Sequence, residues 1–205
     1  YTALALMART VLAHYIPRAL PLQSVLLAIL LVAGAYGFMP LNTKYPDHAA
    51  LRALPLTQRV AACPEPCTFF MFNNNIGIMH NTALYADRPH GSRFASFWFL
   101  PGILHKIETN APDGATARTT YSQMLATDFD KYKPQLLFIG RFALKKDSPE
   151  IFDFGAFFAA DPTFAAQWRK YNKTGTITTT NADYYAGTAL DNDNPIIFDI
   201  YERQK

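Results

Sequence analysis

The sequence predicts an α/β fold class: one transmembrane helix followed by a small layered α/β domain with a mainly parallel sheet. Three observations support this prediction: an uncharged apolar run near the start, helical spacing of apolar residues further on, and short apolar strands between the helices. Strands without polar alternation are typical of sheets covered on both faces, and such sheets are mostly parallel. The roughly 165 residues after the apolar run are enough for one domain with its own core.

The apolar run covers residues 20–39, LPLQSVLLAILLVAGAYGFM, and no charge follows it before Lys44. A membrane-spanning helix needs about 20 mostly apolar residues, which this run supplies. Two alternatives stay open, a buried core helix and a signal peptide, since Arg18 precedes the run and a small-residue stretch lies within it. We therefore expect an interfacial or membrane-proximal segment at 1–19, the transmembrane helix at 20–39 and one domain at 40–205.

The first elements after the run are expected to be a short helix, a strand and a longer helix. Asp47 can cap a short helix that Pro55 interrupts. The compact apolar run at 67–72 predicts a buried strand, and residues 92–105 predict a helix that carries several aromatic side chains.

The second half of the chain is expected to contain a helix, a strand, a second helix and two further strands. Residues 117–132 form the clearest amphipathic pattern, and the apolar run at 135–139 predicts a second buried strand. Asp161 followed by Pro162 predicts a helix start. After that start, three aromatic residues at helical spacing are expected to be core anchors rather than a ligand platform: Phe164, Trp168 and Tyr171. Two further strands are expected at 176–180 and 195–201.

Charge excludes one class of function and leaves the orientation open. The chain has 19 basic and 16 acidic residues, a net charge of +3, and no Lys/Arg run longer than Lys145-Lys146. A nucleic-acid partner would need clustered basic residues, so we expect none. Lys and Arg occur on both sides of residues 20–39, so their distribution does not fix the membrane orientation.

Several motifs occur in a fixed order: SRF at 92–94 with WFLPG at 98–102, KP at 133–134 before an apolar strand, DPTF at 161–164 with Trp168 and Tyr171, and YER at 201–203. In this order they resemble the C-terminal, extracytoplasmic part of bacterial polytopic membrane glycosyltransferases of the GT-C class, which use lipid-linked sugars. The resemblance covers residues 20–205, and its motifs are structural signatures rather than catalytic ones.

The resemblance implies a bacterial inner (cytoplasmic) membrane location with the bulk of the chain on the periplasmic side. In the family, the catalytic carboxylates lie in early loops that have no counterpart here, so no catalytic residue is assigned and this chain alone is expected to catalyse nothing. The expected function is the C-terminal portion of a membrane glycosyltransferase-like protein. The alternatives are a single-span accessory or structural subunit of a larger membrane complex, or a single-span binding protein. The implied partners are membrane lipid and other membrane-embedded segments or subunits, with no cofactor.

The only two cysteines, Cys63 and Cys67, are separated by Pro-Glu-Pro. A loop that turns back can bring such a pair within bridging distance. The oxidising compartment that the resemblance implies favours a disulfide, and free thiols are the alternative. A zinc site would need two more ligands, so no metal is expected.

Asp87, Arg88 and Arg93 are the candidate ligand-binding residues. Together with the Asn run at 73–75 they could gather after the first strand, where open α/β sheets bind ligands. An arginine can bind a phosphate or a carboxylate through two parallel hydrogen bonds, which makes Arg93 the strongest of the three. The alternative is that Arg93 pairs with Asp87 or caps a helix end.

Overall fold

A computed structural model describes residues 48–143, 150–185 and 194–204. The chain divides into two compact units, residues 1–45 and 46–205, and the described residues belong to the second unit. The predicted segments at 1–19 and 20–39 lie outside the described residues. Within the described ranges, no helix is both long enough and apolar enough to cross a membrane.

The second unit is a small α/β domain built on one four-stranded sheet. Its strands are β1 (Phe69–Phe72), β2 (Leu136–Gly140), β3 (Tyr171–Thr180) and β4 (Pro195–Arg203), in the order β1-β2-β4-β3. Only β1 and β2 are parallel, whereas β4 runs antiparallel to both of its neighbours. The predicted mainly parallel sheet is therefore wrong, because β4 returns between β2 and β3 instead of following a crossover helix.

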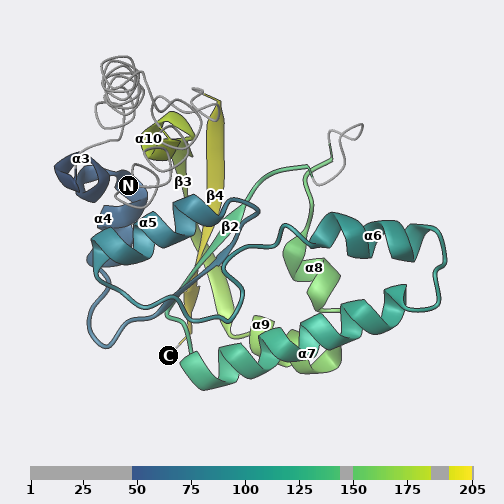
Figure 1. The fold of residues 1–205 in the computed structure, drawn as a ribbon. Helices are drawn as coiled ribbons and strands as arrows, with labels where there is room; N and C mark the ends of the chain where they lie inside the picture. The colour runs from purple at the N-terminus through teal and green to yellow at the C-terminus, as the bar shows by residue number, and fades with distance from the viewer. Residues whose placement is uncertain (1–47, 144–149, 186–193, 205) are drawn as a thin grey trace, which may run out of the picture. The chain divides into compact units, whose positions relative to one another are not determined.

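Helices cover both faces of the sheet (Figure 1). One layer contains α3 (His48–Ala53), α4 (Pro55–Ala61), α5 (Ile76–Ala86) and α10 (Ala182–Tyr185). The other contains α6 (Leu100–Glu108), α7 (Gly114–Tyr132), α8 (Phe154–Phe158) and α9 (Pro162–Trp168).

Two hydrophobic cores result, one on each face. On β1, Phe69 and Met71 belong to the core under α3–α5, whereas Phe70 and Phe72 belong to the core under α6–α9. All four β1 side chains are fully buried, which explains why the strand is apolar at every position. The second core is unusually rich in phenylalanine, and burial of large aromatic side chains dominates the stability of such cores.

Local signals set several element boundaries as expected. The Asp161 side chain accepts hydrogen bonds from the backbone N–H groups of Thr163 and Phe164, which confirms the predicted start of α9. Helix α7 ends at Tyr132, and its C-cap residue Lys133 has the left-handed conformation directly before Pro134. The predicted Cys63–Cys67 disulfide is confirmed, and it closes the loop between α4 and β1.

Other boundaries differ from the predictions. The helix expected at 92–105 begins only at Leu100, because the preceding residues run back beside β1, where the N–H of Phe97 donates to the carbonyl of Asn73. Helix α5 was not predicted. Tyr171 is buried, as expected of a core anchor, but it opens β3 instead of extending α9.

Candidate functional site

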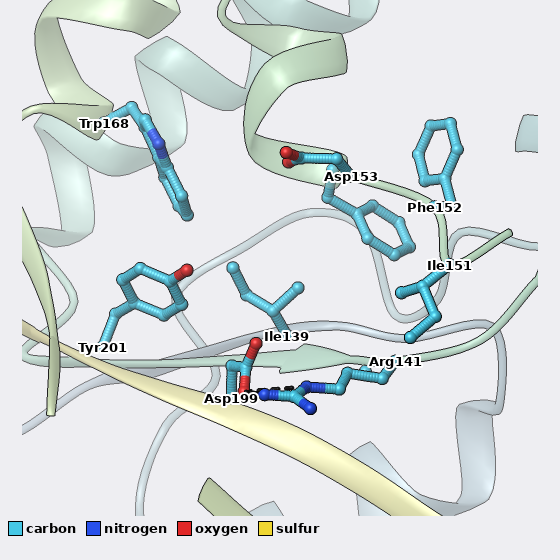
Figure 2. A pocket seen from close by; sticks show the side chains of 10 residues that line it. Ile139, Arg141, Ile151, Phe152, Asp153, Trp168, Asp199 and Tyr201 are labelled. Carbon is cyan, nitrogen blue, oxygen red and sulfur yellow. Dashed lines mark hydrogen bonds and ion pairs between the residues drawn. The ribbon is translucent and has the colours of Figure 1, made fainter. Parts of the chain in front are cut away.

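A pocket of ≈ 260 Å³ lies beside the carboxyl end of β2, on the sheet face covered by α8 and α9. It is lined by side chains from β2, β4, the start of α8 and the end of α9, together with residues just before α8: Ile139, Gly140, Arg141, Ile151, Phe152, Asp153, Phe154, Trp168, Asp199 and Tyr201. Figure 2 shows these side chains. The pocket combines aromatic walls with three charged groups.

The floor of the pocket is an ion-paired carboxylate. Asp199 of β4 is in register with Ile139 of β2, so both occupy neighbouring positions on the same face of the sheet. Arg141 donates to Asp199 Oδ1 through Nε at 3.0 Å and Nη2 at 2.6 Å, and Lys173 Nζ lies 2.9 Å from the same oxygen. In Figure 2 the other carboxylate oxygen of Asp199 points into the pocket, and among the described residues it has no hydrogen-bond partner.

These contacts fix the charge of Asp199. Partial burial alone would raise the pKa of this carboxyl, but the hydrogen bonds and positive charges of Arg141 and Lys173 outweigh burial and lower the pKa below its usual value. Asp199 is therefore ionised at neutral pH and offers a permanent hydrogen-bond acceptor to the pocket.

Trp168 and Tyr201 form an aromatic wall. Their ring centroids are 5.2 Å apart and their planes are tilted by 43°. Trp168 also stacks on the buried Phe164, and its indole lies so close to Gly155 of α8 that a Cβ there would be 2.7 Å from Cζ2. Because Gly155 has no side chain, the indole of Trp168 can lie directly against α8. This close contact holds the ring in place.

Asp153 and Phe152 lie on the opposite side of the opening (Figure 2). The Asp153 side chain caps α8, because its Oδ1 accepts a hydrogen bond from the N–H of Ala156 at 2.8 Å. Asp153 is exposed, and its carboxylate faces Trp168 in Figure 2. The pocket therefore has a second negative group at its rim.

Comparison of the chain with protein family models, curated proteins and solved structures found no match. Within the described ranges, no group of three or more His, Cys, Asp or Glu side chains is arranged to hold a metal ion.

Arg93, the strongest sequence candidate, is bound to a buried carboxylate. Its backbone N–H donates to Asp128 Oδ2 at 2.9 Å, its Nε donates to Oδ1 at 3.0 Å, and Nη2 lies 2.8 Å from Oδ1. Ser92 donates to the same carboxylate. This hydrogen bonding raises the pKa of Arg93. Asp128 on α7 is only 2% exposed, so its charge needs these donors. The partner of Arg93 is thus Asp128 and not Asp87, and any ligand-binding role of Arg93 stays a prediction.

Asp87 and Arg88 lie at the other end of the fold from the asparagine run. Asp87 ends α5 in the left-handed conformation, and the following residues pair with Phe69 at the start of β1. The Arg88 guanidinium contacts Glu65 at 3.1 Å and the carbonyl of Ala61 at 3.4 Å, so it joins the end of α4 to the disulfide loop. The predicted gathering of these residues after the first strand is not formed.

The asparagine run does follow the carboxyl end of β1, where it serves α5. Asn75 caps the helix by accepting a hydrogen bond from the N–H of Gly77, and Asn73 is buried and bonded to the backbone of Asn75. We expected a ligand site after the first strand, β1, whereas the pocket lies at the carboxyl end of the neighbouring strand β2.

Three residues that line the pocket were not predicted from the sequence: Arg141, Asp199 and Tyr201. Arg141 directly follows a buried strand, and Asp199 is the only charge inside the apolar run IIFDIY. A single charged residue inside an apolar run is expected to be paired or functional, and this pattern is visible in the sequence.

Proposed function

We propose that the domain of residues 48–204 is the non-catalytic, ligand-binding part of a membrane glycosyltransferase-like protein, of which this chain is the C-terminal portion, and that it acts on the acceptor side. The observation that carries this proposal is the pocket at the carboxyl end of β2. A concave site that combines aromatic side chains with a few fixed polar groups is a common setting for small-ligand binding. Strand ends of open α/β sheets are where such sites form.

The pKa of Asp199 and the contacts of both pocket carboxylates favour a role in binding over a role in catalysis. A general base works best when its pKa lies near the working pH. Asp199 has a lowered pKa and two cationic partners, so it is a weak proton acceptor. The exposed Asp153 already caps α8. Both groups are suited to accept hydrogen bonds from a ligand.

The glycosyltransferase assignment depends on the resemblance in the order of the motifs, and the same motifs lie at element boundaries of this domain. The KP dipeptide ends α7 before the buried strand β2, the Asp161-Pro162 pair begins α9, and the closing strand β4 ends at Arg203. On the same basis we place the protein in the bacterial inner membrane with this domain on the periplasmic side, in contact with lipid and with other membrane-embedded segments.

The proposal is tested by acceptor kinetics of the complete glycosyltransferase-like protein in membranes. Tyr201→Phe and Asp199→Asn are expected to raise the acceptor KM by about fivefold or more with kcat nearly unchanged, because they remove binding shared by the ground and transition states. Asp113→Asn is the matched control, since Asp113 pairs with Lys106 outside the pocket. Residues 1–205 alone should give no transfer. A large fall in kcat at unchanged KM would contradict a binding role.

One observation favours the accessory-subunit alternative. Ile76 and Leu84 of α5 are 50% and 68% exposed, and the exposed His80 lies between them on the same side of the helix. Exposed large apolar side chains that share a surface are often protein contacts. If this alternative holds, Leu84→Lys should release the protein from a larger complex in size-exclusion chromatography, whereas Tyr201→Phe should not.

A further inference from the structure

The aromatic wall of the pocket offers a flat apolar surface that is already fixed. Trp168 packs on Phe164 with an interplanar angle of 19° and against Gly155, so its orientation is set before any ligand arrives. Trp168 is nevertheless only partly buried and lines the pocket. A preformed surface of this kind favours a ligand with an apolar face, because little conformational entropy is lost on binding.

The polar groups of the pocket offer both a donor and acceptors. The Tyr201 hydroxyl points into the pocket in Figure 2 and makes no hydrogen bond to a described residue. The second oxygen of Asp199 is an acceptor, and the hydroxyl of Tyr201 can donate or accept. A ligand that carries several hydroxyl groups matches this set, since each hydroxyl can also donate and accept.

Among the described residues, the charged side chains that line the pocket are Asp153, Asp199 and Arg141. Lys173 does not line the pocket, but together with Arg141 it compensates the charge of Asp199. An anionic ligand such as a phosphate would lie against two carboxylates, and a quaternary ammonium would lie against Arg141, with the exposed Asp153 as its one uncompensated carboxylate. These charges favour a neutral ligand.

The volume limits the size of the ligand. The pocket measures ≈ 260 Å³, slightly below the roughly 300–1,000 Å³ of typical drug-sized sites. It can take one six-membered ring with its substituents but not a chain of rings. A sugar ring has one face of C–H groups and hydroxyl groups around its edge, and it carries no charge. It therefore meets all three requirements of the pocket: an apolar face, several hydroxyl groups and neutrality.

We infer that this pocket binds a single neutral sugar ring, with its C–H face on Trp168 and its hydroxyls on Asp199 and Tyr201. This inference rests on the proposed function and names the ligand class of the same site. The sugar is bound as part of an acceptor, and no bond is made or broken in the pocket.

Trp168 provides the readout of the test. The chain contains two tryptophans, so Trp98→Phe leaves Trp168 as the sole tryptophan, and Trp98 is 74% exposed and outside the pocket. The purified chain with Trp98→Phe would be titrated with neutral methyl hexopyranosides in buffer free of glycoside detergents. We expect a saturable change of emission with a Kd of about 1 mM, the range that ligand efficiency allows for so small a ligand.

Variants in the same background distinguish the pocket from nonspecific quenching. Tyr201→Phe removes one hydroxyl and should weaken binding about fivefold, the effect of one hydrogen bond. Tyr132→Phe, on the partly exposed end of α7, should leave the Kd within twofold. Circular dichroism melting would verify that both variants are folded.

Three outcomes would overturn the inference: no saturable response to any methyl hexopyranoside, a Kd that Tyr201→Phe leaves unchanged, or tighter binding of tetramethylammonium chloride or inorganic phosphate than of the glycosides. These outcomes are separable from failure of the proposed function. If Tyr201→Phe raises the acceptor KM but no methyl hexopyranoside binds, the proposed ligand-binding function stands and only the sugar is wrong. If substitutions in the pocket leave the acceptor KM unchanged, the proposed function itself is wrong.

Discussion

Two buried tyrosines of this domain differ in one hydrogen bond. The hydroxyl of Tyr171 donates to the carbonyl of Pro134 at 2.8 Å. The hydroxyl of Tyr184 is buried and has no hydrogen-bond partner among the described residues, and neither do the nearby threonine hydroxyls of Thr57 and Thr82. Burial raises the pKa of both tyrosines, that of Tyr184 to about 12, so both hydroxyls are protonated at neutral pH.

We therefore expect opposite effects from the same substitution. Tyr171→Phe should lower the free energy of unfolding by about 1–3 kcal/mol, because it removes a hydrogen bond and leaves the Pro134 carbonyl unsatisfied. Tyr184→Phe should leave the free energy of unfolding unchanged or raise it by up to about 1 kcal/mol, because it removes a buried hydroxyl that has no partner. Urea unfolding of both variants measures the difference. Equal losses would show that a buried water or another group satisfies Tyr184.

Single residues also show where sequence analysis reaches its limit. Arg93 is an arginine in a loop, and nothing nearby in the sequence reveals that Asp128, 35 residues later, is its partner. Asp199 shows the converse, because its role depends on Arg141, which is far away along the chain but adjacent across the sheet. Residue type can be read from sequence, whereas the identity of the partner depends on the tertiary fold.

At the scale of elements, strong local signals gave correct predictions. The strands at β1 and β2 were predicted because both are apolar at every position, and α9 was predicted because Asp161 and Pro162 form a helix start. Helix α5 was missed because Ile76 and Leu84 on its outer side are apolar, so the helix has no continuous polar stripe. Strand direction has no local signal either, and the pairing of β4 between β2 and β3 therefore appeared only in the structure.

Two helical glycines provide a test of how α8 and α9 fix the pocket. Gly102 in α6 has open space around the position of a Cβ, whereas at Gly155 in α8 a Cβ would be 2.7 Å from the indole of Trp168. Gly102→Ala should raise the free energy of unfolding by about 0.5–1 kcal/mol, the usual gain from replacing glycine inside a helix. Gly155→Ala should lower it by about 1–3 kcal/mol, because the ring must move out of a packed position.

Thermal melting and Trp168 emission, both with Trp98→Phe in the background, would measure these effects. Gly155→Ala should change the Trp168 emission maximum, and Gly102→Ala should not. Stabilisation by both substitutions to the same extent would mean that the indole is free to move, and the aromatic wall would then not be preformed.

At the scale of the whole molecule, stability depends on keeping the sheet region free of uncompensated charge. His90 lies beside β1, where its Nε2 accepts a hydrogen bond from the N–H of Met71 at 3.2 Å and its ring stacks on Phe70. Burial is the main reason that the pKa of His90 falls from 6.5 to about 4. A protonated ring could not accept the bond from Met71, so the folded state requires the neutral form.

This requirement predicts acid sensitivity that begins well above the carboxyl range. Above pH 6.5, His90 is neutral in both the folded and the unfolded chain and contributes no pH dependence. As the pH falls below 6.5, the unfolded chain binds a proton that the folded chain does not, so the free energy of unfolding decreases until the pH reaches about 4. By pH 5 the loss from this residue should be about 2 kcal/mol.

Urea unfolding at pH 7.5 and pH 5 measures this loss. In His90→Gln the difference between the two pH values should be smaller by about 2 kcal/mol than in the unmodified chain, even if the variant is less stable at both. His105→Gln is the control, because His105 is exposed on α6, and it should leave the difference unchanged. The comparison between two pH values removes the packing cost of the substitution, since that cost is the same at both. A pH difference equal in His90→Gln and the unmodified chain would show that His90 takes up its proton in the folded state, and the hydrogen bond to Met71 would then not require a neutral ring.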